Sequence, residues 1–106
     1  MDLYLFIDVK NPEVHDESQV WLDQQKNAVY RAICLFKKKN IEKVDHRLKV
    51  FSQDQCIGES FSIIFEHHRG DKRDIDDVVT EANVLYEYLR SECESVGLVV
   101  SQHSSV

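Results

Sequence analysis

An amphipathic pattern near the C-terminus constrains the fold more than any other feature. Apolar side chains recur at spacings of three and four from Ile75 to Val96, the period of an α-helix with one buried face. Asp74 can cap the first turn, and Gly97 stands where helices end in a left-handed residue. A helix with one apolar face is stable only against another layer of structure. The rest of the chain must therefore supply that layer.

Strand patterns occur on both sides of this helix. Apolar and polar side chains alternate, or apolar side chains dominate, over residues 3–9, 43–53 and 59–67, which predicts three strands. The second and third strands should form a hairpin, because five intervening residues cannot make a parallel crossover. Residues 98–100 begin a short last strand, and residues 102–105 are expected to fray.

A second helix is predicted over residues 18–39. Its broad apolar face includes Trp21 and Leu22, and either Asp16 or Ser18 can cap its first turn. Lysines gather in its last turn, where the helix dipole favours cations.

The predicted order is strand, helix, strand, strand, helix, strand. With right-handed crossovers, the economical packing is a four-stranded antiparallel sheet of order 4-1-3-2 with two helices on one face. We therefore expect one α+β domain of the ferredoxin-like type over residues 1–106. That fold hosts many unrelated activities, so function must be argued from sites.

Composition and cysteine usage indicate the compartment. The 106 residues are 42% hydrophobic, which is too apolar for a disordered chain, and no apolar run reaches the length of about 20 residues that a membrane helix needs. Asp2 and Asp8 interrupt the N-terminal apolar residues, so no signal peptide is expected there. Cys34, Cys56 and Cys93 have no Cys-x-x-Cys spacing, which favours reduced thiols in a cytoplasmic protein.

Potential metal ligands gather between residues 66 and 77. Glu66, His67 and His68 are followed by several aspartates, and all are side chains that zinc or iron accepts. Adjacent histidines point to opposite faces of a strand, however, and no His-x-x-x-His or Glu-x-x-His pair occurs. We therefore expect no metal and no cofactor.

Cys34 is the candidate nucleophile. It lies opposite the apolar face of the first helix and one turn before Lys38, whose charge could lower the pKa of the thiol. No Gly-x-Ser-x-Gly motif or phosphate-binding glycine loop accompanies it. Catalysis is accordingly the third of three functional hypotheses.

The net charge of −6 conceals two poles. Residues 1–25 hold six acidic side chains and one basic, whereas residues 26–50 hold two acidic and eight basic. Residues 51–70 hold three acidic and one basic, and residues 71–106 hold eight acidic and three basic. Acidity on the last helix, with an apolar pair beside it, is typical of a surface that binds a basic protein.

This reasoning predicts a partner-binding site on the C-terminal helix and the loop before it. Its residues are Asp71, Asp74, Asp76, Asp77, Val84, Glu87, Tyr88 and Glu94. Tyr88 is the expected anchor. The overall acidity argues against general nucleic-acid binding, because phosphate contacts need clustered lysine and arginine.

An alternative site lies on the predicted sheet. One face could carry Tyr4, Phe6, Arg47, Lys49 and Phe51, which would make a stacking platform with basic side chains. The third strand would add one of two sets, either Phe61 and Phe65 or Ser60, Ser62 and Ile64. It lacks the basic-glycine-aromatic run of RNA-recognition motifs, and a second subunit could equally cover this face.

In size and charge the chain resembles immunity proteins and antitoxins that cap basic nuclease toxins, and phage inhibitors that mimic nucleic-acid charge. The run Asp74-Ile75-Asp76-Asp77, leading to Gly97-Leu98-Val99-Val100, also resembles in outline the bacterial regulator of ribonuclease activity B. The basic middle segment departs from that family. These resemblances imply a non-enzymatic inhibitory protein that occludes the substrate site of a basic partner. The second hypothesis is a homodimer that binds a small ligand or nucleic acid on its sheet.

Overall fold

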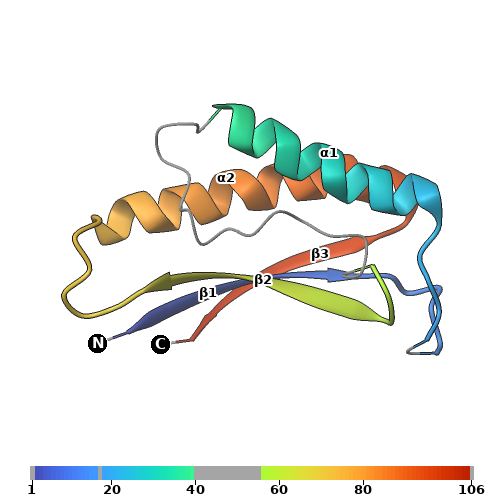
Figure 1. Cartoon of the computed structure of the whole chain (residues 1–106), viewed down its shortest axis with the longest axis horizontal. Helices are drawn as coiled ribbons and strands as arrows, with labels where there is room; N and C mark the ends of the chain where they lie inside the picture. Colours follow the sequence, from blue (N-terminus) through green and yellow to red (C-terminus); the bar gives the residue numbers. More distant parts are fainter. Residues whose placement is uncertain (1, 17, 40–55, 106) are drawn as a thin grey trace.

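The computed structural model describes residues 2–16, 18–39 and 56–105 (Figure 1). The elements run in the order β1 (Leu3–Lys10), α1 (Asp23–Lys39), β2 (Ser60–His67), α2 (Ile75–Cys93), the short 3-10 helix η2 (Glu94–Val96) and β3 (Val99–Ser105).

The described strands form one antiparallel sheet in the order β2-β1-β3. Both α-helices lie on the same face of this sheet, and the described residues place no helix over the other face (Figure 1). The α+β class is therefore confirmed, with three described strands. The predicted strand over residues 43–53 and its hairpin lie outside the described residues.

The core fills the space between the sheet and the helices. Leu5, Ile7 and Val9 of β1 are buried on the helix side, as the alternating pattern predicts. They meet Phe36 of α1 and Leu85 of α2, which are likewise buried. Each large apolar side chain buried in this way stabilises the fold by about 1.5–3 kcal/mol.

The start of α1 corrects the sequence prediction, because the helix begins at Asp23 and not near residue 18. The chain before it is extended, and Val20 forms a bridge with Ile57. The backbone N–H of Trp21 donates to the carbonyl of Cys56 (3.0 Å), and its indole Nε1 donates to the carbonyl of Gly58 (2.7 Å). The second bond gives the buried indole N–H its acceptor. A helix that began at residue 18 would move the indole away from this carbonyl.

Two further predictions about this segment were wrong. Leu22 was expected on the apolar face, but it is 56% exposed. The carboxylate of Asp16 accepts bonds from the backbone and the hydroxyl of Ser18, so neither residue caps the helix. Instead Gln25 accepts the backbone N–H of Leu22 (3.0 Å), as in half of a capping box.

The ends of α2 agree with the sequence. Asp74 accepts a bond from the backbone N–H of Asp76, which caps the first turn. Gly97 has a φ of 81° and its N–H donates to Glu94, so the left-handed residue stands where predicted.

Residues 102–105 were expected to fray, but in the structure they do not. They pair with β1 up to the register Tyr4↔Ser105, because backbone pairing needs no apolar side chains.

Candidate functional site

The solvent-facing side of α2 carries a shallow groove with a volume of about 500 Å³. Two of its lining residues, Val84 and Tyr88, are half-buried and pack against the edge of the core. The described residues that line it are Thr80, Asn83, Val84, Glu87, Tyr88 and Ser91. These positions repeat at spacings of three and four, so the described lining comes from one face of α2.

Three acids that form no direct ion pair with a described residue lie on or next to this groove. Glu87 lines it, and the exposed Asp76 and Asp77 lie one turn before Thr80. The one basic residue of α2 is Arg90, and its Nε donates to Glu94 (3.0 Å). The groove therefore combines an apolar floor with a negative rim.

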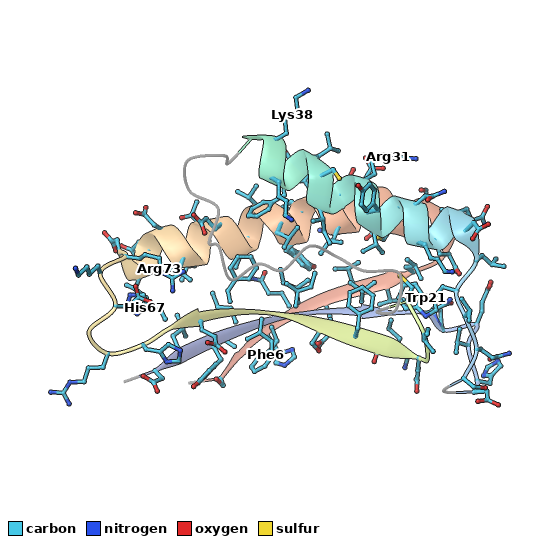
Figure 2. The ribbon with its side chains drawn as sticks, in the orientation of Figure 1. Phe6, Trp21, Arg31, Lys38, His67 and Arg73 are labelled. Atoms are coloured by element: carbon cyan, nitrogen blue, oxygen red, sulfur yellow. The ribbon has the colours of Figure 1, made fainter. Side chains whose placement is uncertain are left out.

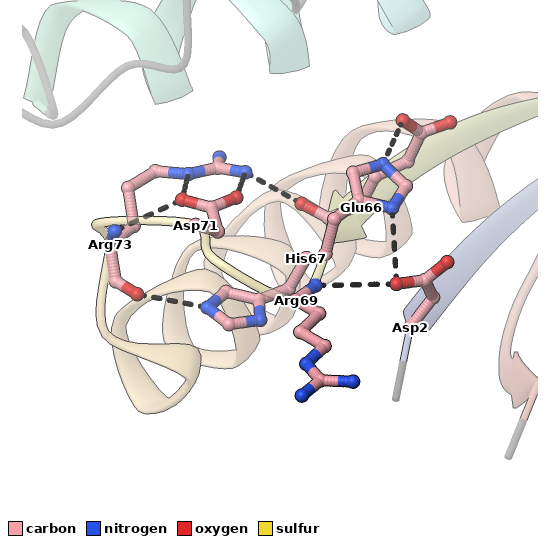
Figure 3. A network of polar contacts seen from close by, with 7 residues as sticks. Asp2, Glu66, His67, Arg69, Asp71 and Arg73 are labelled. Atoms are coloured by element: carbon pink, nitrogen blue, oxygen red, sulfur yellow. Dashed lines mark hydrogen bonds and ion pairs between the residues drawn. The ribbon is translucent and has the colours of Figure 1, made fainter.

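The other predicted acids are engaged locally. Asp71 receives two parallel bonds from Arg73, from Nε (3.0 Å) and Nη2 (2.6 Å), as Figure 3 shows. This charge-assisted fork holds the pKa of the Asp71 carboxyl well below its usual value. Together with Asp74 as helix cap and Glu94 on Arg90, these bonds fix the geometry of α2 rather than present free charge.

The same network ties the end of β2 to the start of α2 (Figure 3). Arg73 also donates to the carbonyl of Glu66 (2.7 Å), and Nε2 of His67 lies 2.9 Å from the carbonyl oxygen of Arg73. The ring of His68 instead lies between Glu66 (3.0 Å) and Asp2 (3.5 Å). The bond to Glu66 is the main cause of a raised pKa at His68.

The two histidines thus bind different partners. Within residues 2–16, 18–39 and 56–105, no group of three or more histidine, cysteine, aspartate or glutamate side chains is placed to hold a metal ion.

A second surface is the sheet face that no helix covers. Tyr4 and Phe6 project from β1 on this side, and Figure 2 shows Phe6 opposite the helices. The ring of His103 stacks on Phe6 with centroids 4.9 Å apart, and Tyr4 lies 6.5 Å from Phe6. Two of the residues predicted for a sheet-face site therefore lie together. Arg47, Lys49 and Phe51 lie outside the described residues.

The strand register decides which part of β2 shares this face. Phe6 pairs with Ile64 and Asp8 pairs with Ser62, so the serine set of the sequence analysis joins the aromatic rings. Phe65 is buried on the helix side, where its ring meets Phe36 edge-on. Ile64 is 47% exposed and widens the apolar part of the open face.

Asp8 lies at the centre of a polar group on the same face. Its carboxylate accepts a bond from the Ser62 hydroxyl and pairs with Nδ1 of His103 (3.1 Å). Serine and histidine therefore bind the same carboxylate instead of each other. Nucleophilic catalysis needs the hydroxyl in reach of the imidazole, and this arrangement directs the hydroxyl elsewhere.

The three cysteines have different environments. Cys34 is exposed on α1, opposite the core, as the helical pattern predicts. Cys56 and Cys93 are buried, and burial raises their pKa values to about 11 and about 12.

Sequence reasoning missed three residues that shape these surfaces, namely Asn83 and two residues of the expected frayed end, Gln102 and His103. His103 was assigned to a frayed end, and the polar run from Ser101 to Ser105 gives no alternation of apolar and polar side chains that would have marked it as part of a strand. Asn83 was not singled out, yet it lines the groove and accepts a bond from Gln102 of β3 (3.0 Å). Only the tertiary contact between β3 and α2 brings that pair together.

Comparison of the chain with protein-family models, with curated proteins and with solved structures found no match. Neither α-helix that the structure describes is both long and apolar enough to cross a membrane.

Proposed function

We propose that this protein is a non-enzymatic inhibitory or regulatory binding protein that acts in the cytoplasm on a basic protein partner. The observation that carries the proposal is the groove on α2, where Val84 and Tyr88 lie beside unpaired acids. An immunity- or antitoxin-type role fits this surface. A nuclease binds polyphosphate through lysine and arginine, and a row of carboxylates can occupy the same cations.

The packing of Tyr88 makes it suitable as an anchor. Because it is already half-buried against the core, little side-chain freedom remains to be lost on binding. Glu87 lies next to it on the helix, and Asp77 lies further towards the helix start. Rim charges of this kind raise the association rate and make it depend on salt.

We also propose that residues 43–53 form a fourth strand beside β2, which would complete a ferredoxin-like sheet. The order β2-β1-β3 supports this, since it matches the first, third and last strands of that fold.

The test uses single charge reversals with a matched control. The partner is first captured from the native host and identified. Its affinity is then measured by calorimetry for Asp77→Lys, Glu87→Lys and Glu13→Lys. Glu13 is exposed in the loop after β1, and its reversal changes the net charge equally.

We expect affinity to fall about threefold to tenfold for the two α2 variants, more at low salt, and to stay constant for Glu13→Lys. Equal affinity for all three variants would remove α2 from the partner interface. A partner without a basic surface would contradict the proposed role.

The open sheet face favours a second candidate, a homodimer that binds a small ligand or nucleic acid. Tyr4, Phe6 and His103 would supply a stacking surface beside Ile64. A stable dimer in light scattering, with no co-purifying protein, would favour this candidate over the first.

A further inference from the structure

The outer edge of β3 is open to another strand. β3 is the last strand of the sheet, and within the described part of the chain only β1 pairs with it. Every residue from Val99 to Ser105 is exposed or half-exposed. The backbone N–H and C=O groups that do not point to β1 therefore face an edge on which the described residues place no other strand.

The β3 strand itself has little protection against strand pairing in its sequence. Natural edge strands are guarded by charged side chains, by proline or by bulges. The sequence of β3, VVSQHSS, contains no proline and no acidic or basic residue apart from His103. It is also seven residues long, which gives an added strand several backbone bonds.

The edge adjoins the groove on α2. Nε2 of Gln102 in β3 donates to Oδ1 of Asn83 (3.0 Å), and Asn83 lines the groove. Glu87 lies one helical turn beyond Asn83. A strand added to β3 would therefore carry alternate side chains past the negative rim of the groove.

The acidic charge of α2 favours a basic segment over a second copy of the chain at this edge. β3 itself bears no formal charge, whereas the α2 face above it bears Asp76, Asp77 and Glu87 without a free cation on the helix. A second copy of the chain would bring its own acidic α2 towards this one. An extended segment with lysine or arginine at alternate positions would instead place its cations against the acids.

We propose that β3 accepts an extended, lysine- or arginine-rich segment of the partner as an added strand, with its cationic side chains against the α2 groove. This inference rests on the proposed function and specifies how the basic partner is held. Backbone bonds to β3 would supply affinity, and the groove would select charge.

The probe is a fluorescein-labelled ten-residue peptide of alternating lysine and valine. Two matched peptides carry N-methyl groups either on the lysines or on the valines, which blocks backbone donation from one edge of the strand. Binding to the whole protein is followed by fluorescence polarisation, and hydrogen exchange of the β3 amides is followed by NMR.

We expect the parent peptide to bind and one methylated peptide to bind about tenfold more weakly or worse, since several backbone bonds are lost. Amides on the open edge of β3 should exchange more slowly with the parent peptide present. Glu87→Lys should weaken peptide binding about threefold to tenfold, and Glu13→Lys should leave it unchanged.

The outcomes separate this inference from the proposed function. If Glu87→Lys weakens binding but both methylated peptides bind like the parent, the acidic groove still binds cations and strand addition is overturned. Failure of the parent peptide to bind overturns the inference as well. The affinity of the captured partner for the Asp77→Lys and Glu87→Lys variants then still tests the proposed function. If the protein dimerises without peptide and the β3 amides are then protected from hydrogen exchange, a second copy of the chain occupies the edge. That result also overturns the inference.

Discussion

The substitution Gln25→Ala should destabilise the protein more than the loss of a polar side chain from an exposed helix position would. Gln25 is 1% exposed and forms a reciprocal side-chain pair with Asn11, which is 2% exposed. Its Oε1 also accepts the N–H of Leu22, and its Nε2 lies 3.4 Å from the carbonyl of Val96. One amide thus joins the loop after β1, the start of α1 and the turn before β3.

The size of the effect follows from the groups left without partners. Removing the Gln25 amide leaves the buried Nδ2 donor of Asn11 without its partner, although Asn11 Oδ1 still accepts the backbone N–H of Glu13, and this costs about 1–3 kcal/mol. Loss of the bond to the Leu22 N–H costs about 0.5–2 kcal/mol, the range for helix caps. Because water can enter the space and recover part of this, we expect a loss of about 1–4 kcal/mol in the free energy of unfolding.

Urea denaturation followed by the fluorescence of Trp21, the one tryptophan of the chain, measures this loss. The exposed neighbour in Gln24→Ala is the matched control and should change the free energy of unfolding by no more than about 0.5 kcal/mol. The double variant Asn11→Ala/Gln25→Ala should lose less than the sum of the singles. A loss for Gln25→Ala no larger than that of the control would refute the reasoning.

Two further predictions concern ionisable groups. Because Arg73 lowers the pKa of Asp71, their pair stabilises the fold above the usual carboxyl pKa and loses this effect as the pH falls towards the depressed value. The stability gap between the wild type and Asp71→Asn in urea should therefore shrink from pH 7 to pH 3, and a constant gap would contradict it. Iodoacetamide at pH 8 should label Cys34 alone in the native protein and all three cysteines in urea, as mass spectrometry can count. Labelling of Cys93 in the native protein would contradict the buried position of this side chain.

The elements with a strong period could be predicted from the sequence. The strand over residues 60–67 and the helix with its Asp74 cap and Gly97 end agree with the patterns that predict them. In these segments local propensity, capping and burial favour the same structure, so no distant contact is needed to choose between alternatives.

The segments that the sequence misplaced depend on distant partners. Trp21 and Leu22 fit a helical face, but the bonds from Trp21 to Cys56 and Gly58 hold the chain extended. Residues 102–105 are polar and fray-prone when considered alone, yet they pair along β1. Local patterns carry no information on such contacts, because their partners lie tens of residues away.

The candidate site divides in the same way. The acidity of the C-terminal helix and the outward positions of Val84, Glu87 and Tyr88 follow from its sequence period. The sequence alone therefore predicted the two helices apart from the start of the first, the strands over residues 3–9 and 59–67, and the charge of one surface. Tertiary structure decided that Asn83 meets Gln102, so that the groove adjoins β3 at the end of the described sheet, and that Phe6 stacks on His103. Strand order and register set these neighbours, and both are fixed by packing across the whole sheet and not by any single segment.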